Sequence, residues 1–457
     1  MTIQVSPSPI PNSDAASLSA TLLDRDAYLT ELLNQITASK SQGWLQVLRD
    51  RATNWVRHST LPTTRDEEWR FTDLSALRQV KFNPVETRSL LAFPQGNFAS
   101  LQPDILPETA NSRLVFVNGV YAPNLSSVAG LPNGVVVGNL DVSSQSSVEK
   151  YLAQSEGALE VFTALNTAAI QDLAVVLVPK NVVVETPIQL VFIAAGDQPI
   201  ISQPRCLVVA ESGSQVTLVE EYRNHRGAEG VYFTNAVTEI CLEDNAQVNH
   251  TRVEWNTTEA FHVGKTAVTQ GRYSRYTCNA ISLGAKISRH NLEILQTGEQ
   301  TETTLNGLTV VGGNQLSDTH SAIALNYPYG KSQQLHKTIV GDRAHAVFNG
   351  KVFVPKPAQL TDAAQLNRNL LLSSKARVDT KPQLEITADN VKCSHGATVS
   401  QLEDDEIFYL QSRGIDEESA RHLLVHGFAA EIINHIPVPS LREKLTQTVN
   451  SLPTPND

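Results

Sequence analysis

The residue types best suited to chemistry stand together in one short segment, Lys392-Cys393-Ser394-His395-Gly396. A thiolate and a neutral imidazole are both iron ligands, and the imidazole can also donate a hydrogen bond at neutral pH. We expect Lys392 to lower the thiol pKa and Gly396 to allow close backbone approach. We take Cys393 and His395 to project from opposite faces of an extended segment, so that one peptide would not easily bind one metal ion through both, although either could be presented to a partner. On residue types alone, a packed strand end is the simpler interpretation.

The other three cysteines, Cys206, Cys241 and Cys278, are far apart and lie in strand-like segments. No two cysteines form a CxxC pair, which argues against a self-contained iron-sulfur or zinc centre. A cysteine within a strand is more often a small buried hydrophobe than a nucleophile, so we predict that all three lie in the core. So few cysteines in a long chain also favour a reducing compartment.

Two further motifs have conventional structural explanations. His422 and His426 stand four apart in a predicted helix with Glu418 one turn earlier, which places three potential metal ligands on one face. The glutamate that follows the first histidine in metalloprotease helices is missing, and a solvated polar face explains the three residues. A P-loop is matched only by residues 264–266 (GKT), with Glu259 where its first glycine belongs, so we predict no nucleotide binding by this chain.

Length and charge set wide limits on the fold and its partners. The chain has 457 residues, with 36 basic and 47 acidic side chains and a net charge of −11. This length predicts two or three folding units, and 41% hydrophobic residues suffice for a large core. The acidic balance argues against nucleic acid as a partner, because phosphate binding needs clustered Lys and Arg.

The start of the chain has no features of a targeting signal. Residues 1–15 lack the basic and apolar regions of a secretion signal, and we predict a disordered leader. The apolar run at 173–178 is far shorter than the ~20 residues of a membrane span. We therefore expect a soluble, cytoplasmic protein with no membrane contact.

The middle of the chain has the texture of strands and tight turns. Strand-turn-strand segments recur, and their turn residues Gly213, Asn245, Gly271 and Gly298 are spaced by 32, 26 and 27. Such spacings are typical of stacked repeats, in which neighbouring coils bury a shared interior. We predict a solenoid of β coils with three short strands in each coil and helical regions covering both ends. A two-sheet sandwich is the competing architecture, but irregular turn spacing suits the solenoid better.

These patterns divide the remaining chain into three domains. We predict an N-terminal helical domain at 16–110, a β core at 111–396 with a helical interlude at 146–170, and a C-terminal helical domain at 397–457. Apolar residues at three- and four-residue spacing predict amphipathic helices between residues 24 and 58.

Two details of the N-terminal domain are predicted from residue types. The second helix should bury a stripe that consists of Trp44, Val47, Leu48, Ala52 and Trp55. The segment that follows, residues 61–74 (LPTTRDEEWRFTDL), places acidic residues beside Trp69 and Phe71. A capped turn packed by these two aromatic rings is its simplest interpretation.

Several ordered segments resemble the SufB/SufD family of iron-sulfur cluster assembly proteins. Four segments match the C-terminal block of the family: Gln365–Ser373 (QLNRNLLLS), Asp379–Ile386 (DTKPQLEI), Ala388–Thr398 (ADNVKCSHGAT) and Phe408–Gly414 (FYLQSRG). Lys337–Val354 (KTIVGDRAHAVFNGKVFV) matches the family core, and Glu68–Leu74 (EWRFTDL) matches the N-terminal helical segment. The resemblance is strong over residues 330–430, patchier over 60–330 and absent in the leader. The sequence is more similar to SufD than to its paralogue SufB, whose usual N-terminal cysteine cluster is missing here.

The resemblance implies both a fold and a function. The implied fold is a right-handed parallel β-helix between helical domains. The implied protein is not an enzyme but a scaffold, which pairs with SufB through the β-helices and carries a SufC-type ABC ATPase on its C-terminal helices. A cysteine desulfurase system supplies sulfur indirectly, and the chain alone could form a homodimer.

The resemblance also assigns roles to residues by position. Cys393 and His395 match SufD residues at the SufB interface, where His395 would bind a nascent, transient iron-sulfur cluster shared with a SufB cysteine. Residues that match the ATPase-binding part are Phe408, Tyr409, Leu410, Arg413, Gly414, Gly427 and Phe428. Asn390 departs from the family pattern, in which an acidic residue is common, and His422 and His426 receive no family role.

Two other functions remain open at this stage. A carbohydrate-active β-helix enzyme would need paired carboxylates on neighbouring coils. Its candidates are Glu220, Glu221, Glu239, Glu243, Asp244 and Glu254, whose spacing marks no pair. A purely structural subunit, which stabilises SufB and anchors an ATPase without holding a ligand, is the other possibility.

Overall fold

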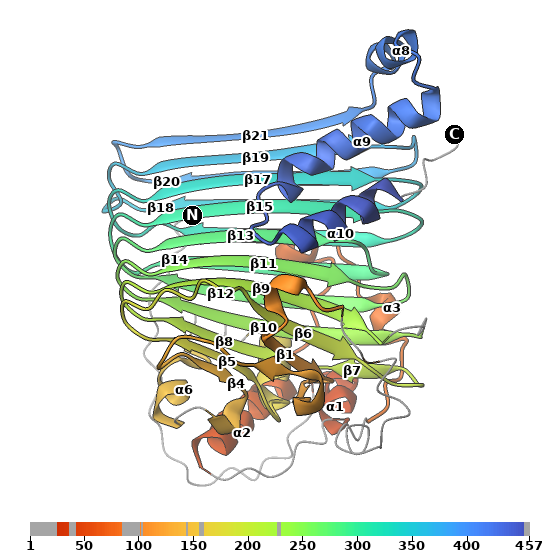
Figure 1. The fold of residues 1–457 in the computed structure, drawn as a ribbon. Helices are drawn as coiled ribbons and strands as arrows, with labels where there is room; N and C mark the ends of the chain where they lie inside the picture. Colours follow the sequence, from red (N-terminus) through yellow and green to blue (C-terminus); the bar gives the residue numbers. More distant parts are fainter. Residues whose placement is uncertain are drawn as a thin grey trace.

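The chain winds between two large β-sheets, so that each coil adds one strand to each sheet (Figure 1). This computed structural model describes residues 25–35, 43–84, 101, 104–142, 145–154, 160–225 and 230–451. From β6 onward, successive strands of a sheet are parallel and in register. The predicted parallel β-solenoid, mainly β with helices at both ends, is therefore confirmed, and a sandwich of antiparallel strands is excluded.

The strands of the described residues form one sheet of eleven strands and one of ten. The eleven-stranded sheet contains β1 (Ser112–Val117), β2 (Val120–Tyr121), β3 (Ser127–Val128), β6 (Ile188–Ala194), β9 (Gln215–Asn224), β11 (Gln247–Trp255), β13 (Arg275–Ser282), β15 (Glu302–Val311), β17 (Lys331–Val340), β19 (Asp362–Leu371) and β21 (Lys392–Gln401). The ten-stranded sheet contains β4 (Val136–Gly138), β5 (Ala174–Val178), β7 (Ile200–Ser202), β8 (Arg205–Ala210), β10 (Tyr232–Leu242), β12 (Phe261–Gln270), β14 (Ile287–Gln296), β16 (Leu316–Ala324), β18 (His345–Val354) and β20 (Arg377–Ile386).

The prediction of three short strands in each coil is wrong, because each full coil has two long strands. From β9 onward these strands contain 8 to 11 residues. A strand of ten residues spans about 33 Å, so two of them and two tight turns complete a flattened coil. Side chains on each strand alternate between the interior and the outer surface.

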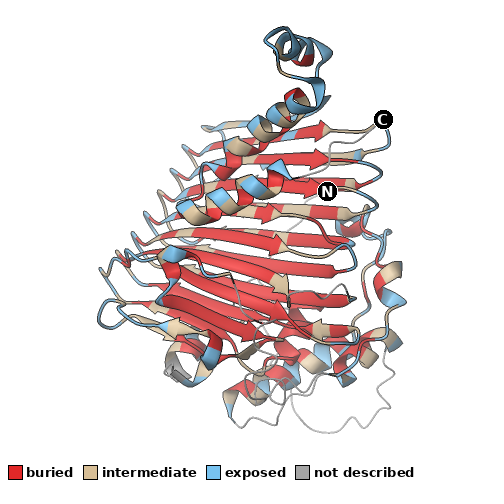
Figure 2. Cartoon of the chain, turned by 45° about the vertical axis from the view of Figure 1, so that its right-hand side comes forward, coloured by how far each residue is buried: buried red, intermediate tan, exposed pale blue. Residues whose placement is uncertain are grey.

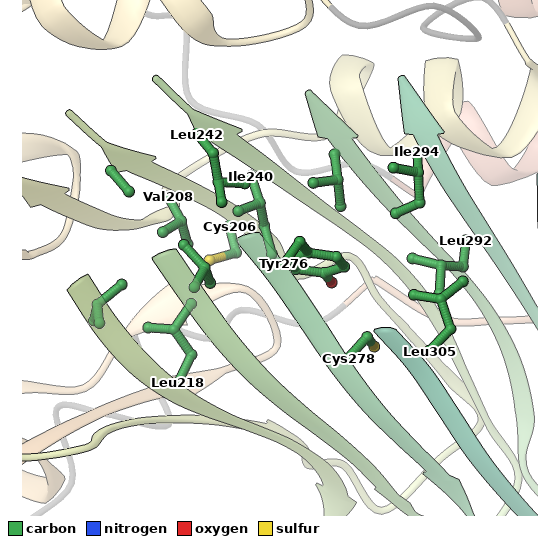
Figure 3. Close-up of a cluster of buried hydrophobic side chains, with 14 of the residues drawn as sticks. Cys206, Val208, Leu218, Ile240, Leu242, Tyr276, Cys278, Leu292, Ile294 and Leu305 are labelled. Carbon is green, nitrogen blue, oxygen red and sulfur yellow. The ribbon is translucent and has the colours of Figure 1, made fainter. Parts of the chain in front are cut away.

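One part of the space between the two sheets is filled largely by apolar side chains. Figure 3 shows Val208, Leu218, Ile240 and Leu305 directed into this space from neighbouring strands. Cys206 and Cys278 are buried among them, as predicted, whereas Cys241 is half-buried and packs against a separate apolar cluster that includes Leu207 and Val209.

One edge of the solenoid has a row of residues in the left-handed conformation. Gly213 and Asn245 have φ angles of 73° and 59°, and the row continues through Tyr273, Gln300, Tyr329 and Leu360. Each of these residues donates its backbone N–H to a carbonyl of the next turn, for example Asn245 to Arg272 at 2.7 Å. Gly271 has another reason to be glycine, because a Cβ there would lie 2.9 Å from the carbonyl carbon of Glu243.

Helices cover the first coils and the outer surface of the ten-stranded sheet. They and the neighbouring 3-10 turns are α1 (Ala27–Asn34), α2 (Trp44–Arg57), η1 (Glu67–Trp69), α3 (Ser75–Arg78), η2 (Pro107–Thr109), η3 (Pro123–Leu125), η4 (Leu140–Val142), α6 (Gln145–Tyr151) and α7 (Val161–Ala168). Leu32 of α1 and Val56 of α2 belong to one core cluster with Phe162 of α7 and with Phe233 and Phe261 of the sheet.

The predicted buried stripe of α2 is wrong in part. Val47 and Trp55 are exposed, and the buried residues are Leu45, Ala52 and Val56. Arg49 is also buried and donates a hydrogen bond to the carbonyl of Ala168 in α7. The aliphatic part of an arginine packs well, which a stripe defined by apolar residue types does not include.

Three helices follow the last strand: α8 (Asp404–Ser412), α9 (Glu417–Ile433) and α10 (Pro439–Asn450). Ile432 of α9 and Leu441 of α10 pack against Val253 and Leu308 on the outer surface of the eleven-stranded sheet. In contrast, α8 projects beyond the end of the solenoid (Figure 1). In the described part of the chain, no helix has the length and apolarity needed to cross a membrane.

Candidate functional site

The segment with Cys393 and His395 is β21, the final strand of the eleven-stranded sheet. Within the described residues β21 pairs only with β19, and β20 pairs only with β18. Both sheets therefore end at the same coil with an open edge of backbone N–H and C=O groups. Such an edge is a template for pairing with another strand.

Cys393 and His395 lie on the same side of β21, contrary to our expectation of opposite faces. Cys393 is in register with buried Ala363, and His395 with buried Gln365. Residues two apart in a strand share a face, so both side chains belong to the column that faces the interior. The Cys393 side chain is half-buried, and His395 is exposed.

The environment of the Cys393 thiol raises its pKa. Burial is the main cause, and the carboxylate of Asp362 adds to it, while a backbone hydrogen bond with Ala363 acts in the opposite direction. The expected lowering by Lys392 is wrong, because Lys392 belongs to the alternate, outer face of the strand and is exposed. In this chain alone, Cys393 is a protonated thiol at neutral pH.

The last coil leaves part of the solenoid interior uncovered. Leu384 of β20 is only half-buried although it packs against the core, and Ile386 is exposed. Val399, on the same side of β21 as His395, is 50% exposed. Figure 2 shows this change from buried middle strands to a more exposed terminal strand. Exposed apolar side chains gathered at one edge are typical of an interaction surface.

The residues predicted to bind an ATPase fall into two places. On α8, Phe408 and Tyr409 are 71% and 56% exposed, and the Arg413 guanidinium lies 5.2 Å from the centre of the Tyr409 ring. Leu410 is half-buried, and Gly414 ends the helix with a φ of 87°. Two exposed aromatic rings on a helix that projects from the body of the protein are suited to binding a partner.

Gly427 and Phe428 lie on α9, away from the projecting part of α8. The Phe428 ring is half-buried against the solenoid, and the Lys337 Nζ lies 4.2 Å from its centre. Lys337 also donates a hydrogen bond of 3.0 Å to the Phe428 carbonyl and forms an ion pair with Glu431. Phe428 therefore anchors α9 to the sheet, while Gly427 is exposed.

The described residues contain no group of three or more His, Cys, Asp or Glu side chains that could hold a metal ion. This result applies to Glu418, His422 and His426 on α9. It applies equally to Cys393 and His395, which are too few to hold a metal centre within one chain.

A polar contact that residue types did not reveal joins the N-terminal region to the ten-stranded sheet. His320 of β16 binds Glu68 through Nδ1 at 3.1 Å and Asp318 through Nε2 at 2.9 Å. Asp318 also binds Arg289 and Thr72, and the Arg289 guanidinium lies 4.0 Å from the centre of the Trp69 ring. The segment is a capped turn with a buried Trp69, as predicted, and it also forms an ionic clasp on the sheet.

The charges of this clasp support one another. Burial opposes the protonation of His320, but Asp318 and Glu68 raise its pKa. Burial likewise opposes ionisation of Asp318, but Arg289 and His320 lower its pKa. Beside the clasp lies a cavity of about 420 Å³, whose walls include Phe71 and Lys381. Within its walls Lys381 forms an ion pair with Glu67, and His320 forms ion pairs with Glu68 and Asp318.

The carboxylates considered for a carbohydrate-active enzyme do not form an accessible pair. Glu220 and Glu254 are sealed inside the solenoid, where they bind His250 and Arg252. The remaining candidates are Glu221 and Glu239, which are buried, and Glu243 and Asp244, which lie at a turn. A glycosidase needs two carboxyl groups that face a substrate, so this arrangement argues against such an enzyme.

Comparisons with known proteins support a role in iron-sulfur cluster assembly. Residues 192–428 match the family model of the SufBD core domain, described as SUF system FeS cluster assembly, and residues 27–190 match the model of the SufBD protein N-terminal region. An iron-sulfur cluster assembly SufBD family protein of Synechocystis sp. is 46% identical over 95% of this chain and 99% of its own length. The iron-sulfur cluster assembly protein SufD of Escherichia coli is 31% identical over 84% of this chain and 88% of its own length. A chloroplastic protein of Arabidopsis thaliana is 34% identical over 96% of this chain and 94% of its own length.

Proposed function

Because the chain belongs to the SufB/SufD family of SUF-system iron-sulfur cluster assembly proteins, we propose that it is a SufD-type scaffold subunit. In this role it pairs with a SufB paralogue and holds a nascent cluster at the shared edge. The observation that carries the proposal is the open end of the solenoid, with Cys393 and His395 on one interior-facing column of its last strand.

The open edge supports pairing with a similar β-solenoid. A partner strand added to β20 or β21 would satisfy the unpaired backbone groups and cover Leu384 and Val399. The partner most complementary to two parallel sheets is another pair of parallel sheets that ends in the same way. The same property allows the chain to pair with itself when the paralogue is absent.

The cluster is the cargo of this edge, and this chain contributes few ligands to it. His395 is the proposed direct ligand, and Cys393 is a second candidate on the same side of the strand. The raised pKa of the Cys393 thiol means that metal binding must displace its proton. Mixed ligands divided between two chains favour release of the cluster to other proteins over permanent storage.

The projecting helix α8 supports an ATPase partner. Its exposed rings, Phe408 and Tyr409, offer an apolar contact, and Asp404 begins the helix only three residues after β21 ends at Gln401. A force applied to α8 by an ATPase is therefore passed directly to the strand that carries His395. In our proposal, ATP binding by SufC-type subunits moves these helices and exposes the edge to iron and to sulfur from a cysteine desulfurase.

The chemistry in this proposal is shared between subunits, and this chain alone catalyses no reaction. In this proposal the chain binds no nucleotide of its own and works in the cytoplasm. A purely structural subunit differs from this proposal in one respect, since it would leave cluster formation independent of His395.

The decisive experiment replaces His395 with alanine in the complex reconstituted with the paralogue and the ATPase. Cluster formation is followed anaerobically by visible absorbance, with iron and a cysteine desulfurase supplied. His422→Ala is the matched control, because it removes an imidazole from α9 at a position without a proposed role. We expect a several-fold lower yield for H395A and an unchanged yield for H422A. Equal yields for both variants would refute the ligand role of His395, and only the purely structural role would remain.

A further inference from the structure

Gln365 is a buried amide directly behind His395. It lies on β19, one coil inside the open edge, is in register with His395, and is only 3% exposed. Its Nε2 donates a hydrogen bond of 2.8 Å to Oε1 of Gln334, whose own amide is bonded to Ser321. Its Oε1 is buried and has no hydrogen-bond partner.

The Gln365 side chain is held in place from two sides. On the opposite sheet it lies over Gly350, where a Cβ would overlap its Nε2 and come within 2.7 Å of its Cδ. Gln334 fixes the other polar end, because the Gln334 carbonyl oxygen accepts from the Gln365 amide. Rotation that would bring the Gln365 oxygen to a donor elsewhere is therefore restricted.

An unmatched carbonyl oxygen in a buried site calls for a donor. The neighbouring residue in the same interior-facing column is His395, and no hydrogen bond of its ring is found among the residues that the structure describes. A neutral imidazole has one N–H donor and one nitrogen with a free lone pair. When a histidine binds a metal, its other nitrogen usually donates to a carbonyl or carboxylate oxygen, which fixes the tautomer and the ring orientation.

We propose that Gln365 is a positioning residue for His395: its Oε1 accepts one ring N–H of His395 when a partner covers the open end, which leaves the other ring nitrogen free to bind iron. This inference depends on the proposed role of His395 as a ligand. It gives a role to a polar amide that lies inside the solenoid at this position, next to a glycine that makes room for it.

The test combines two variants of Gln365 in the complex with the paralogue. Gln365→Met keeps the volume but removes the acceptor, whereas Gln365→Glu keeps an acceptor oxygen. The control is Asn369→Leu, which removes another buried amide of β19 whose Oδ1 also has no partner but whose neighbour on β21 is Val399. Circular dichroism and thermal melting verify that each variant folds.

The first readout is the tautomer of the His395 ring, measured by ¹⁵N NMR with histidine labelling at a pH where the ring is neutral. H395A assigns the signal. We expect one tautomer in the wild type, in Q365E and in N369L, and a mixture in Q365M. If Q365M does not fold, Gln365→Asn withdraws the same oxygen by one methylene and is expected to give the same mixture.

The second readout is binding of Fe(II) to the same complexes. We expect about 10- to 100-fold weaker binding for Q365M, the usual effect of removing the hydrogen-bond partner of a histidine ligand, and near wild-type binding for Q365E and N369L. An unchanged tautomer in Q365M would overturn the proposal. Because the tautomer does not depend on cluster yield, a failure of the Gln365 proposal is distinguishable from a failure of His395 as a ligand.

Discussion

The buried pair formed by Glu220 and His250 provides a quantitative prediction for the substitution Glu220→Gln. The His250 Nε2 lies 2.7 Å from the Glu220 carboxylate inside the solenoid. Burial opposes ionisation of Glu220, but His250 and Arg252 lower its pKa to about 2. Burial also lowers the pKa of His250, but hydrogen bonds with Cys278 and Glu220 raise it to about 9.

The size and sign of the effect follow from these pKa values. The difference between the folded pKa and the ordinary value of either partner corresponds to about 3 kcal/mol, counted once for the pair. The lowered pKa of Glu220 stabilises the fold above pH ~4.5, and this contribution is lost as the pH falls towards 2. The raised pKa of His250 stabilises the fold below pH ~6.5, and this contribution is lost as the pH rises towards 9.

In E220Q, His250 is a buried imidazole without a carboxylate. We expect it to become neutral, like His336, whose burial lowers its pKa to about 4. The variant should be about 3 kcal/mol less stable than the wild type at pH 6 but only about 1 kcal/mol less stable at pH 8, because wild-type stability falls by up to 1.4 kcal/mol per pH unit above 6.5.

Urea unfolding at pH 6 and pH 8 measures the free energy difference, and imidazole NMR follows the titration of His250. His336 serves as the internal control, since it should remain neutral between pH 6 and 9 in both proteins. A free energy difference that is the same at both pH values, or a His250 in E220Q that still titrates near 9, would refute this account of the pair.

Four further predictions concern helix α8, the clasp, one turn and the open edge. Phe408→Ala should weaken ATPase binding at least 30-fold in calorimetry yet change the free energy of unfolding by less than about 0.5 kcal/mol, whereas Val47→Ala, at an equally exposed site on α2, should change neither. Asp318→Ala should lower the free energy of unfolding at pH 6 by about 3–5 kcal/mol, because it leaves Arg289 buried without its partner; a loss below 1 kcal/mol would contradict the clasp. Leu360→Gly should raise the free energy of unfolding, measured by thermal melting, by about 0.5–1 kcal/mol, because it removes the backbone strain of a half-exposed leucine with a φ of 61°. Val399→Lys should reduce self-association of the isolated chain at least tenfold in analytical ultracentrifugation, and unchanged association would mean that self-pairing does not use this edge.

Most of the fold that could be predicted from the sequence came from two sources, the repeated strand pattern and the C-terminal segments. The turns at Gly213 and Asn245 were identifiable because their residue types suit the left-handed conformation. Tyr273 and Leu360 adopt the same conformation although their residue types give no such signal. The stacking of coils imposes the conformation there and overrides local preference.

The clasp between Glu68 and His320 could not be found from either segment alone. The two residues are 252 positions apart, and neither has an unusual neighbour in the sequence. Likewise, the raised pKa of Cys393 depends on packing and on Asp362, whereas sequence proximity favoured Lys392 as the dominant influence. The positions of Cys393 and His395 on one face, however, follow from strand periodicity, so the sequence did contain that information.

The row of left-handed residues also determines where the protein can accept extra chain. The left-handed residue stands two positions before each of the strands β9, β11, β13, β15, β17 and β19, as Asn245 does before Gln247 and Leu360 before Asp362. The connection between β18 and β19 is longer than the one between β12 and β13, and its additional residues all precede Leu360. A short peptide tag or a fluorophore-bearing loop inserted at residues 356–357 would thus leave strand alignment intact. It would place a reporter one coil away from the pairing edge, where subunit exchange could be followed in real time.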